Sequence, residues 1–202
     1  MKMKKLSNIL TIIVVILLII LVFFIKNIYE EIKNSSNKEV KTLDIIENYE
    51  YSLTENDTIL FKEEFKNLKN ILGQEEIDKE KYAESISKLF IIDFYSLESA
   101  INKNDVGGVQ FIYESSKENF IKKAKDTIYN HIENNIYGKR EQELPNVNEV
   151  KLNTIKETEV DDFDEAYILE LTISYEKDLD YPGSIELTIV NNAGKLEIIS
   201  IN

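Results

Sequence analysis

Residues 167–175 read Tyr-Ile-Leu-Glu-Leu-Thr-Ile-Ser-Tyr, and this stretch decides the fold. Its large side chains recur at every second position, at Tyr167, Leu169, Leu171, Ile173 and Tyr175. Successive side chains of a strand point to opposite faces, so this period of two predicts a strand with one buried face.

Three more stretches after Pro145 repeat this pattern. Apolar residues alternate over residues 150–155, 185–189 and 196–201. Clusters of Asp, Asn, Pro and Gly separate the last three strands, at 178–183 and 191–194, and such residues form tight turns. Four consecutive strands joined by short turns predict an antiparallel meander.

Ahead of Pro145 the apolar residues follow the period of a helix. They do so over residues 54–72 and 79–102, and again in a third stretch that ends at Gly138. Ser115 and Glu118 have the spacing of a capping box at the start of this third helix.

These elements predict an α+β fold. Three helices that precede a meander can bury their apolar stripes on only one face of its sheet. We therefore expect about three helices packed on a curved four-stranded antiparallel sheet, within a domain that covers residues 51–202.

The amino-terminal region has a different character. Residues 9–25 are apolar except for Thr11, and every side of a helix formed there would be apolar. Seventeen residues extend about 25 Å, and apolar neighbours lengthen the run. We expect one N-terminal transmembrane helix at 9–25, with a tip at 1–8 and a stalk at 26–50. Bulky residues follow the run where signal peptidase needs small ones, which favours an uncleaved signal anchor over a secreted chain.

The charges around this run predict its orientation. Lys2, Lys4 and Lys5 precede it, while Lys26 is followed closely by Glu30 and Glu31. The positive-inside rule then places the N-terminus in the cytoplasm and the C-terminal domain outside the membrane. Since the wealth of Ile, Lys and Asn suggests an AT-rich bacterial genome, the expected location is the bacterial cell membrane, crossed once.

The composition excludes several classes of function. The chain has 24 Lys and Arg against 37 Asp and Glu, a formal net charge of -13, which argues against nucleic-acid binding. It has no Cys, so disulfides, thiol nucleophiles and cysteine zinc sites are excluded. No cofactor motif is present; Gly107-Gly108 lacks the pattern of a phosphate-binding loop.

The order of elements over residues 50–202 resembles the cone-shaped nuclear transport factor two-like superfamily. Together with the expected anchor, the layout is also similar to bitopic scaffold proteins of conjugation and secretion machines. The resemblance rests on element order and length, so it transfers no residue roles. It implies a non-enzymatic assembly or interaction role.

Asp93 and His131 are the candidates for chemistry in a pocket. Asp93 lies within the apolar stripe of the second helix, and His131, the only histidine, lies at the apolar edge of the third. A buried carboxylate facing an imidazole could transfer protons. The alternative, which we favour, is that both are structural residues with satisfied hydrogen bonds.

Four carboxylates gather between the first two strands, and they are the weak metal candidates: Asp161, Asp162, Asp164 and Glu165. Calcium binds such oxygen ligands, but the spacing is not that of an EF-hand loop, which favours a solvated hairpin tip.

Two functional hypotheses remain. In the first, the domain is a non-enzymatic protein-interaction or assembly module of the bacterial envelope, with an envelope protein as partner or a homo-oligomer. Several tyrosines that do not all fit on the buried stripes favour an interface, among them Tyr49, Tyr51, Tyr95, Tyr113, Tyr129 and Tyr137. In the second, a cone-shaped pocket binds a small ligand or performs acid–base chemistry through Asp93 and His131.

Overall fold

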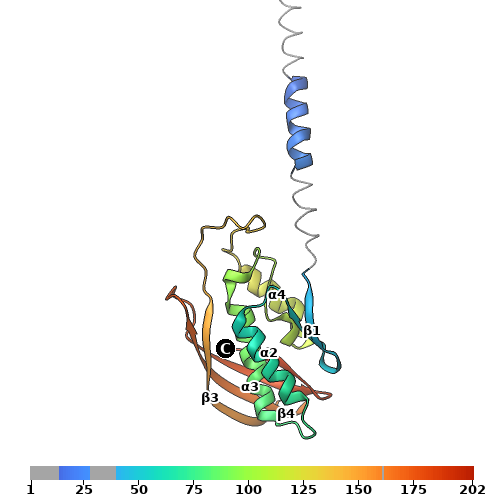
Figure 1. Cartoon of the computed structure of the whole chain (residues 1–202), viewed down its shortest axis with the longest axis vertical. Helices are drawn as coiled ribbons and strands as arrows, with labels where there is room; N and C mark the ends of the chain where they lie inside the picture. Colours follow the sequence, from blue (N-terminus) through green and yellow to red (C-terminus); the bar gives the residue numbers. More distant parts are fainter. Residues whose placement is uncertain (1–13, 28–39, 161) are drawn as a thin grey trace, which may run out of the picture. The chain divides into compact units, whose positions relative to one another are not determined.

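The computed structural model describes residues 14–27, 40–160 and 162–202. It divides into two compact units, Met1–Val40 and Lys41–Asn202. In the first unit, residues 14–27 are helical. The second unit contains all the other helices and strands that the structure describes, and Figure 1 shows them.

The predicted transmembrane helix at 9–25 is wrong on this structure. Throughout residues 14–27, 40–160 and 162–202, no helix combines the length and the apolar character needed to span a bilayer.

The predicted location depended on that helix and is corrected with it. The single-pass placement in a bacterial cell membrane, with a cytoplasmic N-terminus and an extracytoplasmic C-terminal domain, loses its basis. The predicted tip at 1–8, residues 9–13 of the predicted span and residues 28–39 of the predicted stalk lie outside the described residues.

A four-stranded antiparallel sheet forms the second half of the larger unit. Its strands are β3 (Val147–Val160), β4 (Phe163–Tyr175), β5 (Ser184–Asn192) and β6 (Lys195–Ile201), in spatial order β3-β4-β5-β6. Leu171 on β4 lies opposite Leu152 on β3 and Ile185 on β5, so the alternating apolar side chains share one face. That face contributes Leu169, Leu171 and Leu187 to the core at 0% exposure.

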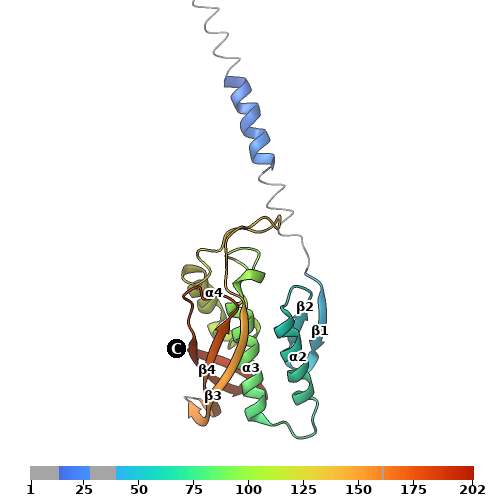
Figure 2. The same cartoon turned by 60° about the vertical axis from the view of Figure 1, so that its left-hand side comes forward.

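Helix α3 lies between this sheet and helix α2 (Figure 2). Helix α2 covers Ile59–Leu72 and α3 covers Lys79–Tyr95. Each begins at a side-chain cap, since Thr58 Oγ1 accepts from the Phe61 amide and Asp78 Oδ1 accepts from the Lys81 amide, both at 3.1 Å. Because α3 has neighbours on both sides, it buries residues around most of its circumference.

Four short 3-10 turns and helix α4 complete the helical part. The turns are η1 (Glu47–Tyr49), η2 (Leu97–Ser99), η3 (Val109–Phe111) and η4 (Glu114–Ser116). The chain after η3 lies beside β6, where Ile112 and Ile198 form a parallel bridge and the Tyr113 amide donates to the Ile198 carbonyl at 2.9 Å.

Helix α4 (Lys117–Asp126) is shorter than the sequence pattern predicts. The predicted capping box does not form: Ser116 is the N-cap residue, with helical backbone angles and no side-chain cap bond. Thr127 leaves the helical region at φ -122° and ψ -98°, which ends α4 well before Gly138. The residues from Thr127 to His131 therefore form turns instead of a continued helix.

A hairpin precedes α2 in a region that the sequence pattern did not identify as strand. Strand β1 (Thr42–Ile46) pairs with β2 (Tyr51–Thr54) in a separate two-stranded antiparallel sheet. Glu50 turns the chain with φ 57°. The compact unit thus begins at Lys41, ten residues ahead of the expected domain boundary.

Candidate functional site

Asp93 on α3 contacts a backbone turn. Its Oδ2 accepts a hydrogen bond from the Gly108 amide at 2.7 Å. Burial raises the pKa of Asp93 to about 7, helped by the charges of Asp57 and Asp105 and opposed by the Gly108 amide. The void beside Asp93 has a volume of about 10 Å³, about enough for one water, so this carboxyl faces no ligand-sized space.

The turn packed against Asp93 requires glycine. A Cβ on Gly107 would lie 2.2 Å from the Asp93 carbonyl oxygen, and Gly108 has a positive φ of 76°. The Tyr129 hydroxyl accepts from the Gly107 amide at 3.1 Å and donates to the Phe94 carbonyl at 2.7 Å. These contacts give Asp93 and its neighbours a structural role in joining α3 to the following loop.

His131 lies away from this arrangement. It is exposed on the turn that follows α4, and its carbonyl oxygen accepts from Gln142 Nε2 at 2.8 Å. No hydrogen bond joins His131 to Asp93 within the described residues. The predicted pairing of Asp93 with His131 required His131 to lie on the third helix. Because α4 ends at Asp126, His131 lies outside that helix.

The predicted acidic cluster is dispersed. Asp161 lies outside the described residues, while Asp162 and Asp164 are exposed. Glu165 instead accepts from Lys79 at 2.5 Å, from the Tyr167 hydroxyl at 2.8 Å and from Asn191 at 2.9 Å. In the chain as described, no group of three or more acidic, His or Cys side chains could hold a metal ion.

The donors around Glu165 control its ionisation. Burial raises the pKa of this carboxyl, but hydrogen bonds from Lys79, Asn191 and Tyr167 outweigh it and leave the pKa below its ordinary value. Glu165 therefore remains ionised at neutral pH, where it joins the start of α3 to β4.

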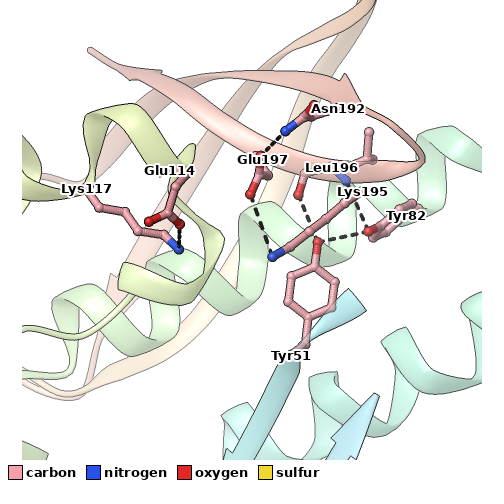
Figure 3. Close-up of polar contacts among 8 residues, drawn as sticks. All are labelled: Tyr51, Tyr82, Glu114, Lys117, Asn192, Lys195, Leu196 and Glu197. Carbon is pink, nitrogen blue, oxygen red and sulfur yellow. Dashed lines mark hydrogen bonds and ion pairs between the residues drawn. The ribbon is translucent and has the colours of Figure 1, made fainter. Parts of the chain in front are cut away.

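A second polar cluster connects the hairpin to β6 (Figure 3). The Tyr51 hydroxyl donates to the Leu196 carbonyl at 2.8 Å, and the Leu196 amide donates to the Tyr82 hydroxyl at 3.2 Å. The two hydroxyls lie 2.9 Å apart, and because the Tyr51 proton is already used, Tyr82 donates to Tyr51. Burial raises the pKa of Tyr82 to about 12 and that of Tyr51 well above its ordinary value, so both remain neutral.

Charged residues of β6 flank these tyrosines. Glu197 is 4% exposed, accepts from Asn192 Nδ2 at 2.9 Å, and lies 3.7 Å from Lys195 Nζ (Figure 3). The Lys195 ammonium also lies 5.2 Å from the centre of the Tyr51 ring. Each buried polar group here has a partner, which gives this cluster a structural role.

The cavity suited to a ligand lies elsewhere, among α3, α4 and the sheet. It has a volume of about 280 Å³, near the lower end of the usual range of small-molecule sites, about 300–1,000 Å³. Its walls come from distant parts of the chain, namely the end of α3, α4 with the turn after it, β5 and β6. The apolar walls include Phe94, Phe120, Ala124, Ile128, Ile185 and Ile201.

Tyr95 lines this cavity and has a hydroxyl that is unpartnered in the part of the chain that the structure describes. The residue is 4% exposed, and its hydroxyl forms no hydrogen bond within the described residues. Among those residues, no side-chain N or O atom is both fully covered and unpartnered. The Tyr95 oxygen therefore keeps some accessible surface, and Tyr95 is one of the residues that line this cavity. Burial raises the pKa of Tyr95, so its hydroxyl keeps its proton as a donor.

Lys123 supplies the positive charge. It lines the cavity from α4, its side chain is exposed, and it makes no ion pair with any described residue. Ser184, also exposed, lines the cavity and has a hydroxyl without a described partner. Thr127 differs, because its hydroxyl donates to the Lys123 carbonyl at 2.7 Å.

Sequence reasoning did not find this cavity. The sequence pattern predicts Tyr95 as a tyrosine of an exposed interface, whereas Tyr51, Tyr95 and Tyr129 are all at most 4% exposed. The available signal was the position of Tyr95 at the end of an apolar stripe, next to Phe94. The other walls come from residues far away in the chain, and no local pattern brings them together.

In comparisons with known proteins, no family model, curated protein or solved structure matches this chain. The resemblance to the nuclear transport factor two-like superfamily therefore stays a prediction.

Proposed function

We propose that the unit formed by residues 41–202 is a non-enzymatic binding module, and that its site is the 280 Å³ cavity at the end of α3. The observation that supports this most is Tyr95, a buried residue that lines the cavity and whose hydroxyl has no hydrogen-bond partner among the described residues. A buried polar group usually has a partner, and a ligand would provide one.

The other polar clusters support binding over catalysis. Asp93 is occupied by the Gly108 amide, and Glu165 by three donors. Tyr51 and Tyr82 are kept neutral by burial and bond to each other. None of these groups lines the 280 Å³ cavity, so the proposal requires no acid–base pair.

Titration of the full chain with 1-octanol, followed by calorimetry, tests the proposal. We expect saturable binding of one molecule. In an Ile128→Trp variant the larger side chain should occupy part of the cavity and abolish the binding. Ile121→Trp is the matched control, since Ile121 is on α4 but does not line the cavity. Absence of binding by the unmodified chain, or equal loss in both variants, would contradict the proposal.

Strand β1 favours a second candidate function, the protein-interaction role predicted from the sequence. Among the described strands β1 pairs only with β2, and its Leu43 and Ile45 are each 50% exposed. Exposed apolar edge strands can pair with a strand of another chain. Crosslinking through a photoreactive residue at position 43 in intact cells tests this role, with position 63 on α2 as control; equal labelling from both positions would count against it.

A further inference from the structure

We propose that the ligand of the cavity is a small amphipathic monocarboxylate, whose apolar chain fills the cavity and whose carboxylate binds the Tyr95 hydroxyl and the Lys123 ammonium. This inference rests on the proposed function, because it assigns a ligand class to the same site.

The size of the cavity limits the ligand. A volume of about 280 Å³ lies near the lower end of the range of small-molecule sites, about 300–1,000 Å³. A molecule of about ten non-hydrogen atoms fits this space. The walls contributed by Phe94, Phe120 and Ile185 require that most of those atoms be apolar, since a polar atom there would lose its hydrogen bonds to water.

The Tyr95 hydroxyl determines the kind of polar group. Its raised pKa keeps the proton in place, so it offers a hydrogen bond to an acceptor. Hydrogen bonds to a charged acceptor are about twice as strong as those between neutral groups, so a carboxylate gains the most from this donor. The free hydroxyl of Ser184 can add a second donor from the rim.

The cavity wall carries a positive charge. Among the described residues that line the cavity, Lys123 is the one with a charged side chain. Helix α4, which carries it, has four lysines against Glu118 and Asp126, an excess of two positive charges on a chain with a formal net charge of -13. A single unpaired ammonium suits one negative charge, which favours a monocarboxylate over a phosphate with about two charges.

Octanoate, with ten non-hydrogen atoms, is the probe that tests this inference in the full chain. We expect calorimetry to show octanoate binding about tenfold more tightly than 1-octanol, and octylamine binding more weakly than either. Lys123→Gln should reduce the affinity for octanoate severalfold and leave that for octanol unchanged, because only the carboxylate uses the charge. Tyr95→Phe, which keeps the ring, should weaken both alcohol and acid.

Lys122→Gln is the matched control, because Lys122 is on the same helix and does not line the cavity. Equal binding of octanol and octanoate, tighter binding of octylamine, or equal effects of the two lysine variants would overturn the carboxylate assignment and leave the binding function standing. If none of the three probes binds, the proposed function fails as well. Thermal unfolding of each variant checks that it is folded.

Discussion

The Gly108 amide donates a hydrogen bond to the Asp93 carboxylate at 2.7 Å, and this bond joins α3 to the loop that leads into η3. The acceptor is a group whose pKa is raised to about 7. The contact fixes the loop, while burial of the same carboxyl gives the folded protein a dependence on pH.

Replacing Asp93 with asparagine should remove part of this pH dependence. An unfolded Asp has a pKa near 3.8, so between that value and about pH 7 the folded state holds a proton that the unfolded state has released. The contribution of Asp93 to stability is therefore greatest below pH 3.8 and is lost as the pH rises to about 7. The amide side chain of the Asp93→Asn variant would remain neutral and could still accept from Gly108.

Thermal unfolding of both proteins from pH 4 to pH 8 measures this effect. We expect Asp93→Asn to melt at a higher temperature than the unmodified chain at pH 8, with a difference that shrinks towards pH 4. The other acidic groups are common to both proteins, so they do not affect the difference. A difference that is constant with pH would contradict the assignment.

Alanine at Gly108 should destabilise the fold more than alanine at Gly138. Both glycines have positive φ, 76° and 65°, and this conformation costs an L-residue roughly 1–2 kcal/mol. A Cβ on Gly108 would also lie 2.7 Å from the Phe90 ring, whereas one on Gly138 meets nothing within 4 Å. We expect Gly108→Ala to lower the free energy of unfolding by about 1–3 kcal/mol more than Gly138→Ala does, as measured by urea unfolding. Equal losses at the two positions would contradict the expected clash with the Phe90 ring.

The hydroxyls of Tyr51 and Tyr82 should act as one unit. Tyr51→Phe leaves the Leu196 carbonyl without its side-chain donor, and Tyr82→Phe does the same to the acceptor of the Leu196 amide. Each should lower the free energy of unfolding by about 1–3 kcal/mol, and the double variant by less than the sum. Tyr113→Phe is the control, since its hydroxyl has no described partner. Strict additivity in urea unfolding would argue against a shared network.

The sequence correctly predicts those elements in which the spacing of the apolar residues matches the spacing of the buried residues. Leu169 and Leu171 alternate in the sequence and lie on the buried face of β4, and Phe61, Phe65 and Leu68 repeat with the turn of α2 and are buried there. For these elements local periodicity and tertiary burial agree.

Where tertiary contacts oppose the pattern, the prediction fails. The apolar residues after α4 continue at helical spacing, but the Tyr129 amide bonds to the Ala124 carbonyl and its side chain bonds to Phe94 and Gly107, which favours a turn. Strand β1 is short, and Tyr51, which bonds the hairpin to Leu196 in the core, is on the neighbouring strand. The cavity joins segments from Phe94 to Asn202, so its position depends on the whole fold.

The contact between Tyr51 and Leu196 joins residues separated by 145 positions, and this separation has a consequence for the order of folding. The meander closes only short loops, whereas docking the hairpin closes a loop of almost the whole compact unit and carries a larger entropic cost. We expect the sheet to form before the hairpin docks. Tyr51→Phe should then accelerate unfolding in stopped-flow experiments and leave the folding rate unchanged, because its contacts form after the rate-limiting step.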